Sequence, residues 1–270
     1  MPYFERDDNL RLHYEEQGEG RPIIFIHGVW MSGRFFRQQL SALGESYRVI
    51  ALDLRGHGQS SRVEHGHTMK TYAQDVRDFI TGLGLEDVIL AGWSMGCFVV
   101  WEYFRHFGAE NLAAAVFVDE GASDFKWPDW ELGLFDLPTV CHLMDAIQEG
   151  WLPFREGFLP SMFREPPSDN DLQWMLQETG KVPPSIASAV LFSQTLQDYR
   201  PDLGKVSVPS LIVYGGAEGK LVPVAAGEHL RDNMPDARLT VFENSSHCPF
   251  LEEPTRFNRE VDQFIQSLAG

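Results

Sequence analysis

The residues best suited to chemistry form the pentapeptide Gly92-Trp-Ser-Met-Gly96, in which a serine stands between two glycines. The apolar run Val88-Ile-Leu-Ala91 leads into it, and a largely apolar stretch over residues 96–107 follows. The order of buried strand, tight turn and helix is typical of a nucleophile elbow, which raises the serine hydroxyl above the edge of a sheet. The sequence therefore predicts that Ser94 is a catalytic nucleophile rather than a serine that only caps a helix.

A serine hydroxyl attacks a carbonyl efficiently only when a base takes its proton. His247 is the best candidate, because it follows the strand-like run Arg238-Leu-Thr-Val-Phe242 within a short loop. Active sites of open α/β sheets gather at the carboxyl ends of the strands. We therefore expect His247 to be the base.

The third partner should be a carboxylate that orients the imidazole, placed between the serine and the histidine in the chain. Glu218 follows the apolar run 210–214 and is the favoured candidate. Glu120 follows the run 113–118 and is the alternative, with Asp119 among the remaining carboxylates. For each of them the competing interpretation is a solvated loop carboxylate.

Another pair of residues points weakly to a metal. His65 and His67 form an H-x-H pattern in a glycine-containing loop, but no further His or Asp ligands cluster nearby. A catalytic zinc ion needs three protein ligands. We therefore expect no metal and no other cofactor.

The elements that must position these residues are strands alternating with helices. Unbroken apolar runs over 22–26, 47–53, 88–91, 113–118 and 210–214 are typical of parallel strands buried on both faces, and 10–16 alternates like an early edge strand. Helical periodicity over 69–83 and 254–268, together with the apolar stretch 96–107, supplies crossovers. This alternation predicts an α/β fold with a mostly parallel, doubly wound sheet.

One segment interrupts the alternation. Residues 121–205 are rich in Trp, Phe, Leu, Met and Pro and separate two strands by far more than a crossover needs. The sequence predicts a helical cap over 121–205, inserted into a core domain formed by residues 1–120 and 206–270.

The amino-acid composition restricts the classes of binding partner. The 22 basic and 39 acidic residues give a formal net charge of −17, which disfavours nucleic acid and anionic membranes as partners. Three scattered cysteines form no disulfide framework or zinc motif, and neither a signal peptide nor a membrane-spanning apolar run is visible. A cytoplasmic location is the simplest expectation, and the sequence does not indicate an oligomeric state.

Beyond the elbow, several motifs resemble the α/β-hydrolase superfamily over nearly the whole chain. They are His27-Gly-Val-Trp30, Asp53-Leu-Arg-Gly-His-Gly-Gln-Ser60, Gly92–Gly96, the loop from Gly215 to Pro223, and His247. The chain is most similar to small bacterial esterases, lactonases and cofactor-free haloperoxidase-like perhydrolases. The resemblance implies that the backbone N–H groups of Val29 and Met95 form an oxyanion hole.

The resemblance also bears on the triad acid. The family usually places an Asp three residues after the glycine that ends the late strand, and Glu218 stands at that offset from Gly215. Pro223 lies one residue further along than usual, so the loop carries an insertion. That departure keeps Glu120 as an alternative, because some family members take their acid from the earlier strand end.

An unusual supply of aromatic residues in the 121–205 segment and near the elbow predicts an apolar substrate pocket. Most of these side chains should pack the cap, but we expect several to contact a substrate. The candidates for substrate binding are Trp30, Trp93, Trp130, Leu143 and Met144.

The function best supported by these patterns is serine-dependent hydrolysis of small apolar carboxylic esters or lactones through an acyl-enzyme. N-acyl homoserine lactones are one candidate class, because related enzymes share the His-x-Pro-Phe-x-Glu-x-Pro run, here His247–Pro254. Alternatives on the same triad are perhydrolysis, amide hydrolysis and C–C bond hydrolysis, which fold and motif do not separate. A non-catalytic ligand receptor is a further alternative. Haloalkane dehalogenation is disfavoured because its nucleophile is a carboxylate.

Overall fold

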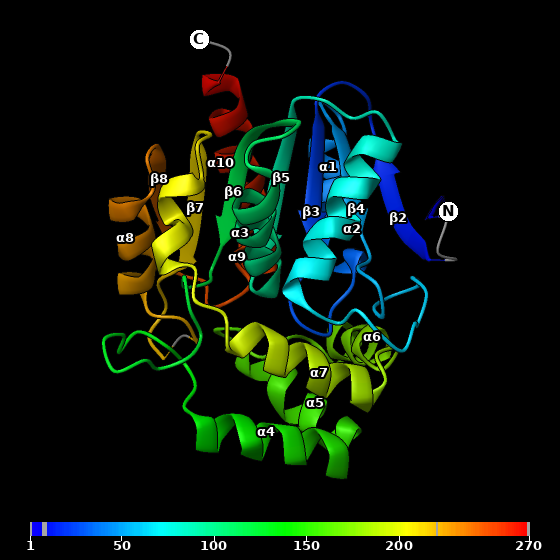
Figure 1. Ribbon diagram of the computed structural model, residues 1–270, viewed down its shortest axis with the longest axis vertical. Helices are drawn as coiled ribbons and strands as arrows, with labels where there is room; N and C mark the ends of the chain where they lie inside the picture. Colours follow the sequence, from blue (N-terminus) through cyan, green and yellow to red (C-terminus); the bar gives the residue numbers. More distant parts are fainter. Residues whose placement is uncertain (1, 7–9, 220, 269–270) are drawn as a thin grey trace.

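The computed structural model describes residues 2–6, 10–219 and 221–268. Over these residues the chain forms an eight-stranded sheet in the order β1-β2-β4-β3-β5-β6-β7-β8 (Figure 1). The strands are β1 Tyr3–Glu5, β2 Arg11–Gln17, β3 Pro22–Ile26, β4 Arg48–Leu52, β5 Val88–Trp93, β6 Leu112–Val118, β7 Ser210–Gly215 and β8 Ala237–Phe242. In this order, every neighbouring pair from β4 to β8 is parallel. β2 pairs antiparallel with both β1 and β4. The predicted α/β class with a mostly parallel sheet is confirmed.

Helices cover both faces of this sheet, as a doubly wound fold requires. Successive residues of β3 alternate between the faces: Ile24 and Ile26 belong to one apolar cluster, and Ile23 and Phe25 to the other. The first cluster includes side chains of α2 Met69–Gly82, α3 Met95–Phe107 and α8 Val224–Asn233. The second includes side chains of α1 Arg37–Leu43, α9 Pro249–Glu252 and α10 Pro254–Ser267.

The structure corrects one expectation, which is the position of the strand over residues 11–17 in the sheet. It was expected at the edge of the sheet, but β1 pairs with it on the outer side. β1 has only three residues, too few to show a periodic pattern, so it could not be predicted from the sequence.

The chain between β6 and β7 contains four α-helices and a short 3₁₀-helix. They are α4 Leu137–Glu149, α5 Trp151–Ser161, α6 Asp169–Thr179, α7 Pro184–Thr195 and η2 Arg200–Lys205. Helices α4–α7, here called the covering helices, lie together beyond one end of the sheet (Figure 1). All of these elements fall within residues 121–205, where the sequence predicted a helical segment. The division into a core domain and a cap domain remains a prediction.

Candidate active site

Ser94 occupies a strained turn between β5 and α3. Its φ of 53° lies in the left-handed region, which a residue with a side chain rarely adopts. The flanking glycines allow this turn: a Cβ on Gly92 would lie 2.4 Å from the Gly96 carbonyl carbon, and one on Gly96 would lie 2.2 Å from the Ile26 oxygen. The turn therefore presents the Ser94 hydroxyl at the carboxyl end of the sheet, where its side chain lines a cavity.

His247 lies in the loop that follows β8, and two hydrogen bonds to its own backbone groups hold it in place. The Trp93 indole Nε1–H donates to the His247 carbonyl at 2.8 Å, and the His247 N–H donates to the Met162 carbonyl at 2.9 Å. His247 is buried and lines the same cavity as Ser94. The structure thus brings together the two residues predicted as nucleophile and base.

The carboxylate that contacts the imidazole is Asp119. His247 Nδ1 lies 2.7 Å from Asp119 Oδ2, and Asp119 Oδ1 accepts a hydrogen bond of 2.7 Å from the Gly215 N–H. Asp119 is the first residue after β6, and its own N–H donates to the Val213 carbonyl of β7. This carboxylate therefore occupies the position that a triad acid requires.

The expectation that Glu218 is the acid does not agree with this geometry. Glu218 is exposed in the loop after β7. The residues before it pair toward β8, because the Gly216 N–H donates to Phe242 and the Ala217 N–H donates to Ser245. That path carries Glu218 into solvent, while the end of β7 contributes a backbone N–H to Asp119 instead.

Glu120, the alternative acid, lies against the serine. Its Oε2 is 3.4 Å from Ser94 Oγ, and its Oε1 accepts a hydrogen bond of 2.8 Å from the Gly121 N–H. Burial, followed by the charge of Asp124, raises the pKa of the Glu120 carboxyl well above its ordinary range. Among the described residues, the carboxylate hydrogen-bonded to His247 is that of Asp119, so Glu120 does not take the place of the acid.

Val29 and Met95 lie where the resemblance requires them. Val29 lines the cavity beside Ser94. Met95 is the first residue of α3, and the first backbone N–H groups of a helix have no acceptor within it. Their role as an oxyanion hole remains a prediction that this placement supports.

The cavity that contains Ser94 and His247 has a volume of about 170 Å³. It lies between the carboxyl ends of the strands and the covering helices. Its remaining lining residues are Val29, Trp30, Glu120, Asp124, Leu134, Phe135, Leu143, Phe154, Phe158, Ser161, Leu191, Gln194 and Leu221. Trp30 and Leu143 were proposed from the sequence, whereas Phe154 and Phe158 were not.

Three of the proposed substrate-binding residues lie elsewhere. Trp93 is buried against Phe250 on the other face of the sheet, where it holds the His247 carbonyl. The Trp130 indole N–H donates to Ser123, and its ring packs on His229 with centroids 4.7 Å apart. Met144 packs against the first apolar cluster and is not among the cavity-lining residues of the described chain.

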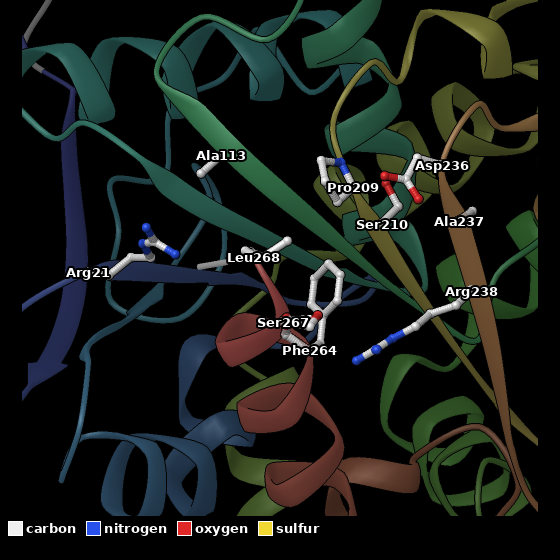
Figure 2. Close-up of a pocket in the computed structure, with 10 residues that line it drawn as sticks. All are labelled: Arg21, Ala113, Pro209, Ser210, Asp236, Ala237, Arg238, Phe264, Ser267 and Leu268. Atoms are coloured by element: carbon white, nitrogen blue, oxygen red, sulfur yellow. Dashed lines mark hydrogen bonds between the residues drawn. The ribbon is translucent and has the colours of Figure 1, made fainter. Parts of the chain in front are cut away.

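A second cavity of about 480 Å³ lies at the opposite end of the sheet, near the starts of β7 and β8 (Figure 2). Its polar side chains include Arg21, Arg238, Asp236 and Ser210, and the Ser210 hydroxyl donates to the Val208 carbonyl. No histidine is among its lining residues, so it offers Ser210 no base comparable to His247.

One of the two histidines considered as metal ligands makes other contacts. His67 Nε2 lies 2.7 Å from the Val63 carbonyl, and its Nδ1 lies 3.2 Å from the Tyr72 hydroxyl. Residues 2–6, 10–219 and 221–268 contain no group of three or more His, Cys, Asp or Glu side chains that could hold a metal ion. Within the same residues, every helix is too short or too polar to cross a bilayer.

Comparisons with known proteins agree with the fold described above. The sequence profile described as "Alpha/beta hydrolase family" matches residues 23–260. A non-heme haloperoxidase from Rhodococcus erythropolis is 32% identical over 281 residues, which cover 99% of this chain and all of that protein. Among solved structures, an esterase from Exiguobacterium antarcticum has a TM-score of 0.92 with 25% identity over 98% of each chain. A bromoperoxidase from Bacillus anthracis has a TM-score of 0.90 with 26% identity, over 95% of this chain and 96% of its own.

Proposed function

Because the chain belongs to the alpha/beta hydrolase family, we propose that it hydrolyses carboxylic esters or lactones through an acyl-enzyme on Ser94. The observation that carries this proposal is the single cavity lined by the strained Ser94 and by His247, whose Nδ1 contacts Asp119. Nucleophile, base and acid then come from the ends of β5, β8 and β6.

In the proposed mechanism, His247 Nε2 takes the proton from Ser94 Oγ as the hydroxyl attacks the ester carbonyl. Asp119 holds the imidazole tautomer with its proton on Nδ1 and stabilises the imidazolium that forms. The N–H groups of Val29 and Met95 stabilise the oxyanion. His247 then returns the proton to the departing alcohol and activates a water that releases the acid.

The covering helices complete the proposed site as a cap. Their side chains supply much of the apolar lining, including Leu143, Phe154, Phe158 and Leu191. An apolar acyl or aryl group would be buried there, and water would be excluded from the carbonyl. For a lactone the chemistry is identical, except that the released alcohol stays attached to the acyl group.

A second candidate function is perhydrolysis, which the relationship to a non-heme haloperoxidase favours. The first half of the reaction is unchanged. Hydrogen peroxide then replaces water as the attacking group, and the acyl-enzyme releases a peracid instead of an acid.

The test is covalent labelling combined with turnover. An alkyl fluorophosphonate should add one phosphonyl group to Ser94, identified by mass spectrometry, and Ser94→Ala should remain unlabelled. Wild-type protein should hydrolyse p-nitrophenyl butyrate, and Ser94→Ala should lose about 10³-fold or more in kcat. Parallel assays with acyl lactones, and with esters plus peroxide, separate the candidate reactions. A protein that neither reacts with the phosphonate nor turns over any ester is a ligand receptor, and the proposal fails.

A further inference from the structure

Besides Ser94, Ser161 and His247, the cavity has one wall with three buried polar side chains. Glu120 and Asp124 come from the segment that follows β6, and Gln194 comes from α7. Their exposed fractions are 2%, 1% and 3%. Burying polar groups this deeply is costly unless they are hydrogen-bonded, so the partners of each oxygen carry information about what the cavity binds.

The wall contains acceptors without protein donors. Gln194 Nε2 donates to Asp124 Oδ2 at 2.6 Å, and Glu120 Oε1 accepts from the Gly121 N–H. Among the described residues, no N–H or hydroxyl donates to Asp124 Oδ1 or Gln194 Oε1. Both atoms belong to residues that line the cavity. Each atom is itself shielded from the cavity, so it reaches a bound ligand only when the end of its side chain rotates.

The charged groups around the cavity restrict the class of ligand that it can bind. Two carboxyl groups share this wall, and none of the cavity-lining residues is Lys or Arg. Burial, followed by the charge of Asp124, raises the pKa of Glu120. This environment favours the neutral form of Glu120. A bound cation would favour its charged form instead.

Aromatic side chains also line the cavity, namely Trp30, Phe135, Phe154 and Phe158. Aromatic rings attract ammonium groups through their negative faces. Carboxylates supply charge-assisted hydrogen bonds to the same groups. The net charge of −17 also raises the local concentration of cations.

We propose that the cavity selects substrates bearing a protonated amine, which the carboxyl groups of Glu120 and Asp124 and the Gln194 carbonyl hold beside Ser94. Glu120 Oε2 lies 3.4 Å from Ser94 Oγ, so the amine must sit close to the scissile carbonyl. Esters of amino acids and short amino-alcohol esters have this arrangement. The identity of the reacting group rests on the proposed ester hydrolysis, whereas amine binding does not.

Binding an ammonium ion should release the proton from Glu120. The titratable groups around this carboxyl are Asp119, Asp124, Cys97 and Tyr214, and His247 acts on the neighbouring Asp124. The Cys97 thiol stays neutral because burial raises its pKa well above 9. Amine affinity should therefore increase with pH across the titration of Glu120, as long as the ligand itself stays protonated.

The experiment measures binding without turnover. Isothermal titration calorimetry on the wild-type protein compares 2-phenylethylammonium with 2-phenylethanol, which has a similar shape but no charge. We expect the ammonium to bind about 10- to 100-fold more tightly, the range that a charge-assisted hydrogen bond of about 1.5–3 kcal/mol provides. Titrations in two buffers of different ionisation enthalpy should show proton release with the ammonium only.

Variants assign the effect to this wall. Asp124→Asn should remove the preference for the ammonium, whereas Asp145→Asn, an equal charge change at an exposed position of α4, should keep it. If Asp124→Asn does not fold, Glu120→Gln provides the same comparison and should also abolish proton release. Equal affinity of wild-type protein for both compounds, or full preference in both wall variants, overturns the proposal.

A turnover comparison then connects binding to reaction. The ester of phenylalanine should have a higher kcat/KM than methyl 3-phenylpropanoate, which lacks only the amine. If neither ester reacts while the ammonium still binds selectively, the amine site stands and ester hydrolysis fails. If both react equally and the ammonium shows no preference, ester hydrolysis stands and the amine site fails.

Discussion

Asp119 uses both oxygens of its carboxylate, and each contacts a different part of the molecule. Oδ2 meets the His247 imidazole, and Oδ1 meets the Gly215 N–H at the end of β7. A carboxylate held at both oxygens cannot rotate freely, so it favours the imidazole tautomer that carries its proton on Nδ1. The Nε2 lone pair is then available toward Ser94.

This geometry predicts the effect of removing the charge. Asp119→Asn should lower kcat by about 10²–10⁴-fold, because the amide neither fixes the tautomer nor stabilises the imidazolium. Glu218→Gln, at an exposed position, is the matched control and should leave kcat within a factor of two. Steady-state kinetics with an aryl ester measures both. A slow Glu218→Gln enzyme and a normal Asp119→Asn enzyme would return the acid to the late strand.

The buried carboxyl of Glu120 predicts how the stability of the fold depends on pH. Burial raises its folded-state pKa above the ordinary value of 4.5, so the stabilising contribution of its neutral form is present below pH 4.5 and is lost as pH rises through the folded-state pKa. Glu120→Gln keeps a neutral side chain at every pH. It should therefore raise Tm by about 2 °C or more at pH 8, and by much less at pH 4.

Thermal unfolding followed by circular dichroism at the two pH values provides the measurement. Glu218→Gln again serves as the control, and its Tm should match that of the wild type at both. A gain for Glu120→Gln that is equal at pH 4 and pH 8 would mean that charge burial is not its cause.

At the scale of elements, the strands were the easiest features to predict. The unbroken apolar runs of β3, β5 and β7 correspond to strands buried at every residue. The helices α1 and α8 were not predicted. They are short, at seven and ten residues, and too few positions repeat to define a periodic apolar face.

The site was harder to predict because strand register decides it. Trp93 pairs with Val118, so the next residues, Ser94 and Asp119, emerge side by side at the ends of neighbouring strands. A single sequence does not show that pairing. Glu218 was preferred because it follows a buried strand at the offset from Gly215 where the family usually places its acid. The polar wall was also invisible, because Asp124 and Gln194 are 70 residues apart in the chain.

The close packing of α3 against the sheet predicts the stability effect of replacing a glycine by alanine. Gly96→Ala should destabilise the fold by about 1–3 kcal/mol, because its Cβ would lie 2.2 Å from the Ile26 oxygen. Gly157 in α5 has no atom within 4 Å of an added Cβ, so Gly157→Ala should stabilise by up to about 1 kcal/mol. Urea unfolding gives both values. Equal effects at the two positions would show that close packing at the elbow is not the constraint.

At the scale of the whole molecule, the covering helices are tied to the core by a few polar contacts. Glu178 of α6 accepts hydrogen bonds from the Ser32 hydroxyl at 2.9 Å, the Arg34 guanidinium at 3.0 Å and the Lys181 ammonium at 2.8 Å. In addition, the Trp30 indole N–H donates to the Ala187 carbonyl of α7. The contacts of Trp30, Ser32 and Arg34 join the covering helices to the segment that follows β3.

Glu178→Ala should loosen this attachment. It leaves the buried Ser32 hydroxyl without its acceptor, and we expect a loss of about 1–3 kcal/mol together with faster proteolysis within α6 and α7. Glu165→Ala, at an exposed position of the same segment, is the control. Limited proteolysis with mapping of the cut sites distinguishes the two. Identical cleavage of both variants would show that Glu178 does not hold the covering helices in place.

The hydrogen bond from the His247 N–H to the Met162 carbonyl has a consequence for how opening of the site can be timed. Met162 caps the end of α5, so this amide is protected by a covering helix and not by a strand of the core sheet. We expect it to exchange with solvent deuterium each time that helix lifts, whereas amides of the central strands wait for global unfolding. The exchange rate of this one amide therefore records how often the covering helices open in the intact protein.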